Sequence, residues 1–575
     1  MRSWLIEPLI PGNHMTYLAY ASTPWLTLLI LSPLVGLALT ALAGALRLDD
    51  RTAMIGATAW STVPLALAII VWVGFNPNAT ADGQGVVQFV EKIPWVQAIR
   101  VDYFVGVDGI SMPLVILTAA MTPVAMLASF NITQRVKLYL ALMFLLETAM
   151  LGYFLALNFF FFFIFWEFSL VPAYFLIQGW GRRHTTDADP EQRRRDAALK
   201  FFVYTMAGSI GMLLLFQFFY VATAAAGIPT FDLITLARLG QGLTVERAAL
   251  DPVNLTLQEI IFNYVEQLGI ADVLGRYPLL YTSIAFWAIF IAFAIKLGIW
   301  PFHTWLPDAY SEAPPAASIL LAAVMSKMGA YGMLRLMLPL VPDAAQYFGP
   351  AIGALALIGV VAGAFGALAQ VGGDLKRLIA YTSVNHMGYV GLAIAAAATV
   401  GAADVATRAT AINGALFQMV AHGLSTGALF LMAGMLAERT GSDDMRSLAG
   451  LRTTMPVFAG AMGVATFANL GLPGLAGFVG EFFIFRGVWA SLPLFALLAT
   501  IGLVVTALAL LRMYGQMFHG QTNEHSAMPD MRLAGREFLA VAPLLIALLI
   551  LGVYPAPIMD LSNQTATALA RVFLP

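Results

Sequence analysis

Ionisable side chains stand in the middle of long apolar segments of this sequence of 575 residues. They are Glu147, Glu167, Lys296, Lys327, His386, His422 and Glu481. An ionised side chain at the centre of a bilayer costs roughly 2.5–3.5 kcal/mol on insertion scales, so it needs a partner or a function. Carboxyl, amine and imidazole groups can all bind and release a proton. A row of such groups at membrane depth predicts transfer of protons or cations.

A glutamate and a lysine that meet inside a membrane can control a proton. Removal from water disfavours the charged form of each group, and a nearby opposite charge favours it. Making and breaking a Glu–Lys contact would therefore load a proton on the lysine or release it. For Glu147 or Glu167 alone, a structural hydrogen bond between helices is the alternative. His386 and His422 could equally be interhelical contacts, and haem ligation by this pair is allowed by geometry but disfavoured.

Long apolar runs must supply the helices that hold these groups. The chain is 60% hydrophobic and 11% charged, whereas a soluble domain carries roughly 25% charged residues. A membrane-crossing helix needs about 20 apolar residues. We therefore expect an all-α integral membrane protein of about fourteen transmembrane helices. The expected spans are 23–45, 53–74, 107–130, 137–157, 158–177, 198–224, 281–310, 314–338, 349–370, 376–399, 411–436, 455–490, 493–518 and 537–553.

These spans form a single polytopic membrane domain over residues 1–575. Pro301 and Pro473 stand in the middle of the seventh and twelfth spans, and a proline in mid-helix breaks the hydrogen-bond ladder. Broken helices at corresponding positions are typical of inverted repeats in transporters. The expected parts are helices 1–3 in 1–130, the first repeat in 137–338, the second repeat in 349–518 and the last helix in 537–575.

The orientation follows from the lysines and arginines. Placing both termini on the outer, periplasmic side puts about twice as many of them in the inner loops as in the outer loops. Among the outer connections, residues 76–100 read as a short hairpin, and 225–280 as amphipathic stretches that cap the outer face.

Composition excludes several classes of function. The formal net charge of −2 argues against a nucleic-acid partner. The absence of cysteine excludes disulfides, cysteine-ligated zinc and ordinary iron–sulfur clusters in this chain. Any electron transfer coupled to this chain must therefore occur elsewhere, and no cofactor or metal site is expected in it.

Several motifs resemble the antiporter-like membrane subunits of respiratory complex I. They lie at 165–172, 296–309, 378–388, 421–424 and 480–482. The segment Gly106-Val107-Asp108-Gly109-Ile110-Ser111 is similar to the M-type subunit in particular. The resemblance covers roughly residues 100–520, and the long blocks are highly specific.

The resemblance implies a fold with two inverted repeats of about five helices each and broken seventh and twelfth helices. It places Glu167 and Lys296 as an ion pair, Lys327 as the central lysine and Glu481 as the outlet residue. Glutamate at position 481 favours the M-type, because the L- and N-type subunits usually carry lysine there. Glu147 resembles a second acidic position of M-type subunits.

The resemblance also implies partners and a location. L- and N-type antiporter-like subunits would flank this chain in the cell membrane, while FMN, iron–sulfur clusters and quinone would belong to partner subunits. The loops at 225–280 and 182–197 look longer than usual for the family, which puts partner contacts there in doubt.

These observations together predict a subunit that couples quinone reduction elsewhere to proton transfer along Glu167, Lys296, Lys327, His422 and Glu481. Two rivals remain open. One is a subunit of a multi-subunit sodium/proton antiporter, which needs no redox partner. The other is the equivalent subunit of a membrane-bound hydrogenase or of a photosynthetic complex, which takes electrons from a different donor.

Overall fold

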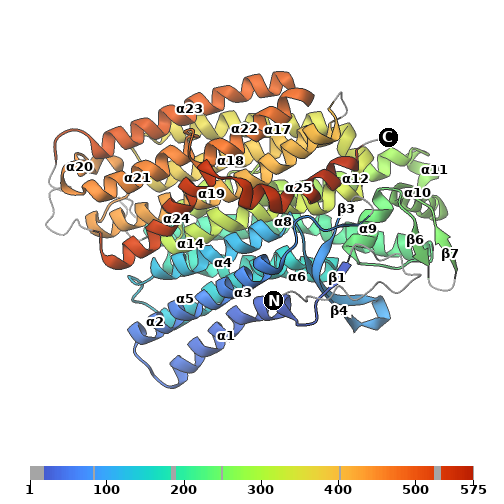
Figure 1. Ribbon diagram of the computed structural model, residues 1–575, viewed down its shortest axis with the longest axis horizontal. Coiled ribbons are helices and arrows are strands. Elements are labelled where there is room, and N and C mark those ends of the chain that lie inside the picture. Colours follow the sequence, from blue (N-terminus) through green and yellow to red (C-terminus); the bar gives the residue numbers. More distant parts are fainter. Residues whose placement is uncertain are drawn as a thin grey trace.

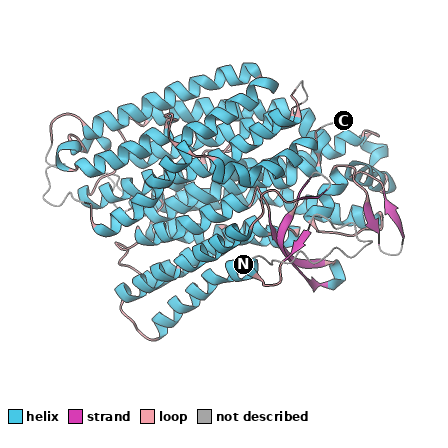
Figure 2. Ribbon diagram, viewed as in Figure 1, coloured by secondary structure: helices cyan, strands magenta, loops and turns pink. Residues whose placement is uncertain are grey.

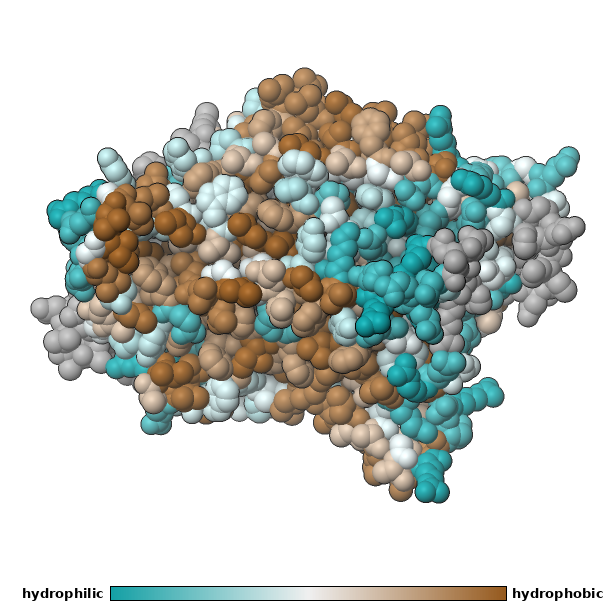
Figure 3. Space-filling model, turned by 180° about the vertical axis from the view of Figure 1, so that it is seen from behind, coloured by the Kyte–Doolittle hydropathy of each residue, from teal (hydrophilic) through white to brown (hydrophobic). Residues whose placement is uncertain are grey.

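Long helices lie side by side along the long axis of the molecule in the computed structural model (Figures 1 and 2). The structure describes residues 18–81, 84–182, 189–247, 250–399, 403–522 and 533–573. Eleven helices within these ranges are long and apolar enough to cross a membrane. Hydrophobic residues cover much of the face seen in Figure 3, mainly along its top and its left and lower parts, and a hydrophilic area lies to the right of its centre.

The helices of the first half occupy the predicted spans. They are α1 (Trp25–Ala45), α2 (Asp50–Trp60), α3 (Thr62–Gly74), α4 (Met112–Leu127), α5 (Val136–Leu155), α6 (Phe159–Phe168), α7 (Leu170–Trp180), α8 (Pro190–Ala225), α12 (Pro278–Leu297), α13 (Trp305–Glu312), α14 (Pro315–Leu320), α15 (Ser326–Gly332) and α16 (Leu338–Leu340). The pairs α2–α3 and α6–α7 each form one interrupted span, as do α14–α16 with two π-helical segments, η2 (Leu321–Met325) and η3 (Met333–Met337).

The second half is also a series of long helices. Its helices are α17 (Pro342–Ala369), α18 (Leu375–Ala398), α19 (Val405–Thr440), α20 (Leu451–Thr454), α21 (Pro456–Asn469), α22 (Ala476–Ser491), α23 (Pro493–Phe518), α24 (Gly535–Val553) and α25 (Ala556–Arg571). The amphipathic α25 packs against α19 and crosses the face of the bundle in Figure 1. Three predicted spans, at α4, α18 and α21–α22, are not among the eleven long apolar helices, so the number fourteen and the repeats stay predictions.

Both proline breaks are confirmed. Helix α12 ends at Leu297 and α13 begins at Trp305, on either side of Pro301. Helix α21 ends at Asn469 and α22 begins at Ala476, on either side of Pro473. The sequence did not predict the interruption at Ser169 between α6 and α7, nor the π-helical turns of the eighth span.

Short strands and helices gather at one end of the bundle, which we call the strand end. Strands β1 (Leu18–Tyr20), β4 (Val87–Val96) and β5 (Val101–Val107) form one sheet, with β1 parallel and β5 antiparallel to β4, so the hairpin predicted at 76–100 is extended and shifted along the chain. Two further hairpins pair β2 (Thr80–Ala81) with β3 (Gln84–Gly85) and β6 (Val245–Arg247) with β7 (Leu250–Val253). The short helices α9 (Leu233–Gly240), α10 (Leu257–Gln267) and α11 (Ile270–Leu274) also lie at the strand end.

The opposite end carries the basic loops, and we call it the basic end. Arg182 pairs there with Asp374 and Asp443, which joins three loops from both halves of the chain. Burial acts to lower the pKa of Arg182, but the charges of Asp443 and Asp374 outweigh it and raise that pKa above its ordinary value. Because the pair members come from both predicted repeats, this contact fixes the repeats to each other.

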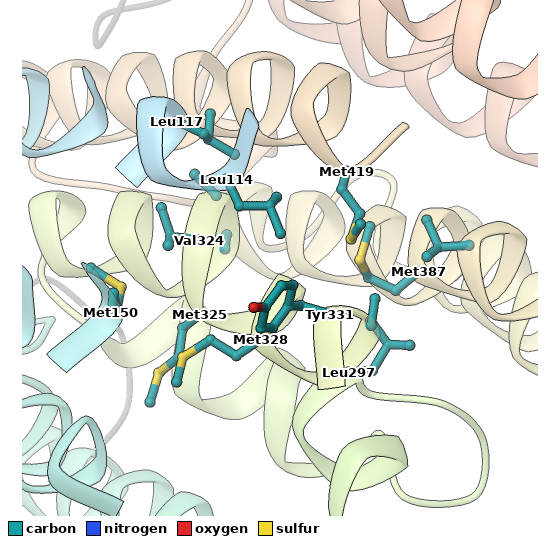
Figure 4. Close-up of a cluster of buried hydrophobic side chains, with 14 of the residues drawn as sticks. Leu114, Leu117, Met150, Leu297, Val324, Met325, Met328, Tyr331, Met387 and Met419 are labelled. Carbon is teal, nitrogen blue, oxygen red and sulfur yellow. The ribbon is translucent and has the colours of Figure 1, made fainter. Parts of the chain in front are cut away.

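The core lies around the eighth span. Side chains from α4, α5, α12, α15, α18 and α19 converge there, among them Met150, Met328, Met387 and Met419 (Figure 4). Two glycines of α15 permit the close approach of α12, since a Cβ on Gly329 would fall 2.7 Å from the backbone nitrogen of Leu297. The packing therefore holds the helices that carry Lys296 and Lys327 against each other.

Candidate proton-transfer site

Lys327 occupies the centre of the bundle. It is completely buried and lies on α15, between the π-helical segments η2 and η3. The Nζ atom donates to the carbonyl oxygen of Ala322 at 2.6 Å and lies 3.3 Å from Ser326 Oγ. A π-helical turn displaces the regular pattern of carbonyls and is frequent at functional sites. The local backbone thus supplies an acceptor to a lysine for which the described residues show no carboxylate partner.

His422 is the nearest titratable neighbour of Lys327. Its Nδ1 atom lies 2.6 Å from Lys327 Nζ, and its Nε2 atom lies 3.2 Å from Ser383 Oγ. If the amine donates, Nδ1 accepts and Nε2 carries the ring hydrogen. A glycine follows at position 423, where a Cβ would lie 2.9 Å from the carbonyl oxygen of Ala323. The small residue lets α19 approach η2 closely enough for the contact to form.

His386 continues the series from His422. The two imidazole ring centroids are 5.3 Å apart, and both residues are almost fully buried. Gln418 Nε2 lies 3.0 Å from His386 Nδ1, and Asn469 Oδ1 lies 3.3 Å from His386 Nε2. Both amides orient the ring, which is how buried histidines are commonly held for proton transfer.

Glu481 ends the series beside the break of the twelfth span. Its Oε1 atom lies 3.6 Å from His386 Nδ1 and has no hydrogen-bond partner among the described residues. Its Oε2 atom lies directly against Gly471, where an added Cβ would overlap it. Gly471 has a φ of +79°, a conformation that favours glycine. Lys327, His422, His386 and Glu481, on four different helices, therefore form one buried row.

Lys296 and Glu167 lie together on another part of the path. Lys296 is completely buried at the end of α12, and its Nζ atom donates to Ser169 Oγ at 3.1 Å. The same Nζ atom lies 4.8 Å from the centroid of the Trp166 ring. Glu167 is half-buried and interacts electrostatically with Lys296, but no ion pair joins them in the described residues. Their direct pairing stays a prediction.

Glu147 stands apart from both groups. It is completely buried on α5, and neither carboxyl oxygen has a hydrogen-bond partner in the described part of the chain. Helices α5 and α6 contact each other. That Glu147 and Glu167 share one membrane depth stays a prediction. The structure does not bring Glu147 into the Lys327–Glu481 row.

Polar residues that orient the titratable groups were missed by the sequence analysis: Ser169, Ser383, Gln418 and Asn469. Gln418 precedes His422 by four residues and Ser383 precedes His386 by three, so each shares the face of a titratable residue on its own helix. Ser169 and Asn469 meet their partners across helices that are far apart in the chain. Within the described ranges no cluster of three or more His, Cys, Asp or Glu residues could hold a metal ion.

A membrane helix bundle with two broken helices and a buried row of titratable side chains defines the class of antiporter-like, ion-translocating membrane proteins. Comparison with known proteins agrees. Residues 156–508 match the family described as NADH:quinone oxidoreductase/Mrp antiporter, TM. Residues 86–158 match the amino terminus of NADH-ubiquinone oxidoreductase chain 4.

Comparison with individual proteins shows which members of this family the chain is similar to. The chain is 35% identical to NADH-quinone oxidoreductase subunit M of Mycobacterium tuberculosis, over 94% of this chain and 93% of the relative. A chain of respiratory complex I from Thermus thermophilus superposes with a TM-score of 0.75 at 25% identity, covering 96% of this chain and 100% of that one. A chain of the Mrp complex from Dietzia reaches 0.71 at 20% identity, with the same coverage, which is a likeness of fold alone. The chain belongs to the subunit M family of NADH-quinone oxidoreductase, and it is a multi-pass membrane protein.

Proposed function

We propose that this chain is a proton-translocating membrane-arm subunit of an NADH:quinone oxidoreductase. The observation that carries the proposal is the buried row of Lys327, His422, His386 and Glu481 inside an antiporter-like fold. Charged and imidazole groups at this depth are costly unless they serve transfer. The energy for the transfer would come from electron transfer from NADH to a quinone, which is the reaction named in the subunit M relatives.

The residues divide the transfer into steps. Events in partner subunits bias Glu167, whose charge acts on Lys296. A proton on Lys296 repels one on Lys327, and loss of the proton from Lys327 to His422 needs only the existing 2.6 Å contact. The 5.3 Å between the ring centroids and the 3.6 Å from His386 to Glu481 call for ring rotation or a bridging water molecule. Glu481 then releases the proton towards the outlet.

Partners and location follow from the same proposal. Redox groups (FMN, iron–sulfur clusters and quinone) belong to other subunits. L- and N-type antiporter-like subunits pack on either side of it in the cell membrane, with both termini on the outer side. The described ends support a location of both termini on one side, because Leu18–Tyr20 pairs with β4 and Phe573 lies against Arg408 near the start of α19, both at the strand end.

A multi-subunit sodium/proton antiporter is the second candidate, because the family description names the Mrp antiporter and a Mrp chain shares the fold. Among the superposed structures the identity is 25% to the complex I chain and 20% to the Mrp chain, and the subunit M relative is 35% identical, which favours the first candidate. The equivalent subunit of a hydrogenase or of a photosynthetic complex remains a third candidate.

Purification of the native assembly in mild detergent tests the proposal. We expect subunits with flavin and iron–sulfur clusters to copurify, and NADH oxidation by quinone to acidify the lumen of vesicles that contain the assembly. A stable assembly of membrane subunits alone, with sodium/proton exchange and no redox cofactor, would show that the antiporter is the correct function. Hydrogen or ferredoxin as the electron donor would identify the third candidate.

A further inference from the structure

A large cavity opens at the basic end of the bundle. Its volume is about 530 Å³, and its walls come from the α4–α5 loop, the start of α14, the end of α19 and the start of α24. Polar residues among its lining are Asn131, Tyr139, Glu438, Arg439 and Arg536. A second cavity of about 220 Å³ shares Asn131, Pro314, Pro315 and Glu438 with the first. Cavities of this size and polarity hold several water molecules.

Acidic and basic groups of the cavity wall are arranged so that one carboxyl group, that of Glu438, has no ion pair with an arginine among the described residues. Arg439 and Glu537 form an ion pair through both carboxylate oxygens. Glu438 instead accepts a hydrogen bond from the Asn131 amide. Glu438 is therefore the carboxyl group of the wall that has a neutral hydrogen-bond donor rather than an arginine as its closest contact, and it can exchange a proton with water in the cavity.

A seam of hydroxyl groups leads from this cavity into the bundle between α4 and α5. Thr118 and Thr122 lie on one face of α4, one helical turn apart, and Ser129 follows two turns later, just beyond the end of that helix. Ser129 Oγ lies 3.0 Å from the hydroxyl of Tyr139, which lines the cavity. Thr118, Thr122 and Ser129 donate their hydrogens to carbonyls one turn back on α4. Their oxygen lone pairs remain free to accept hydrogen bonds from water.

Glu147 lies at the inner end of the seam, beside Thr122. Both of its carboxyl oxygens are buried and unpartnered within the described structure. A polar group buried without a partner costs several kcal/mol, and an isolated charge costs more, so Glu147 requires a bound proton or water molecules. Six residues further along α5, Tyr153 donates to the carbonyl oxygen of Met328, next to Lys327. Glu147 is therefore on the helix that touches the lysine-bearing span.

We propose that the α4–α5 seam is the proton uptake route of this subunit. A proton passes from water in the cavity at Glu438, along water molecules held by Tyr139, Ser129 and Thr122, to the carboxylate of Glu147. Protonated Glu147 then releases the same proton towards the amine of Lys327, across the contact between α5 and α15, and its carboxylate is restored. This route rests on the proposed function, because it supplies the row that begins at Lys327, and it assigns to Glu147 a role separate from the Glu167–Lys296 pair.

Cysteine scanning in the intact assembly tests the seam without relying on proton pumping. The chain has no cysteine, so a single introduced thiol is the only one that it contains. Ser129→Cys and Thr122→Cys place thiols on the seam, and Val124→Cys places one on another face of α4 between them as a control. Vesicles are treated with a small charged methanethiosulfonate on the side of the basic loops, and modification is read by mass spectrometry of this chain.

We expect modification of Ser129→Cys and Thr122→Cys and none of Val124→Cys. Modification of Ser129→Cys alone would show that water stops at the cavity and would overturn the route. Thr118→Cys replaces Thr122→Cys if the latter does not assemble. Glu147→Gln should then lose proton pumping with assembly retained, and normal pumping by this variant would refute its role as the loading residue. Labelling does not depend on pumping, so labelling of both seam variants together with a wild-type assembly that does not pump would refute the proposed function instead.

Discussion

Replacement of Gly471 by alanine should displace the Glu481 carboxylate while the bundle still folds. Gly471 lies between α21 and α22, in the break of the twelfth span, with a φ of +79°. A Cβ there would overlap Glu481 Oε2. That atom is the far end of a flexible side chain, so the carboxylate will move and the backbone of the break will stay. The same movement changes the 3.6 Å separation between Glu481 Oε1 and His386 Nδ1.

Two magnitudes follow from this geometry. An alanine in the left-handed conformation costs about 1–2 kcal/mol, which a large membrane protein tolerates. Relief of the overlap requires the carboxylate to move by about 1 Å to reach ordinary van der Waals contact. A misplacement of 1 Å in a reacting group can slow a transfer step by about 100-fold. Stability should therefore fall slightly while proton transfer through Glu481 falls strongly.

Gly474→Ala is the matched control. Gly474 lies in the same break with a φ of +92°, but a Cβ there meets nothing within 4 Å. Both variants carry the same kind of backbone strain, and only Gly471→Ala touches Glu481. The assay measures NADH-driven acidification of vesicles, normalised to the assembled complex on native gels. Equal pumping by the two variants would refute the placement of Glu481 in the path.

Three further predictions concern the other charged groups. Glu167→Gln and Lys296→Ala should each nearly abolish pumping while assembly survives, and complete loss of assembly on native gels would show that the pair is structural. Glu481→Lys should pump better than Glu481→Ala, since lysine can also carry a proton, and equal activity in the vesicle assay would disprove the outlet assignment. Arg335→Ala should destabilise the protein by about 3–5 kcal/mol in thermal unfolding, because it leaves the buried Asp108 carboxylate without its 2.7 Å partner. Full stability of this variant would mean that water already compensates Asp108.

The positions of the breaks could be read from the sequence because their cause is local. Proline lacks a backbone donor and clashes with the preceding turn in the interior of a helix. Pro301 and Pro473 therefore predict a helix break at their own positions. The interruption at Ser169 and the π-helical turns beside Lys327 have no such signal. They arise where neighbouring helices pack, and no residue type in the chain marks them.

The hydroxyl and amide side chains that contact the titratable residues could not be predicted from the sequence either. Lys296 was expected to pair with Glu167, yet its Nζ atom donates to Ser169, which stands at the junction of α6 and α7. His386 was placed at mid-span correctly but without its amide neighbours Gln418 and Asn469. A hydroxyl or amide in an apolar run is too common in membrane helices to identify a partner.

The sequence by itself determined which segments are apolar enough to cross a membrane and how far along its helix each titratable residue lies. Those properties depend on residue type and on distance along one helix, and both are fixed by the order of amino acids. Only the tertiary structure decided that Lys327, His422, His386 and Glu481 touch in series while Glu147 faces a separate seam. The physical reason is that the rotation of each helix about its axis is set by side-chain packing between segments that are far apart in the chain.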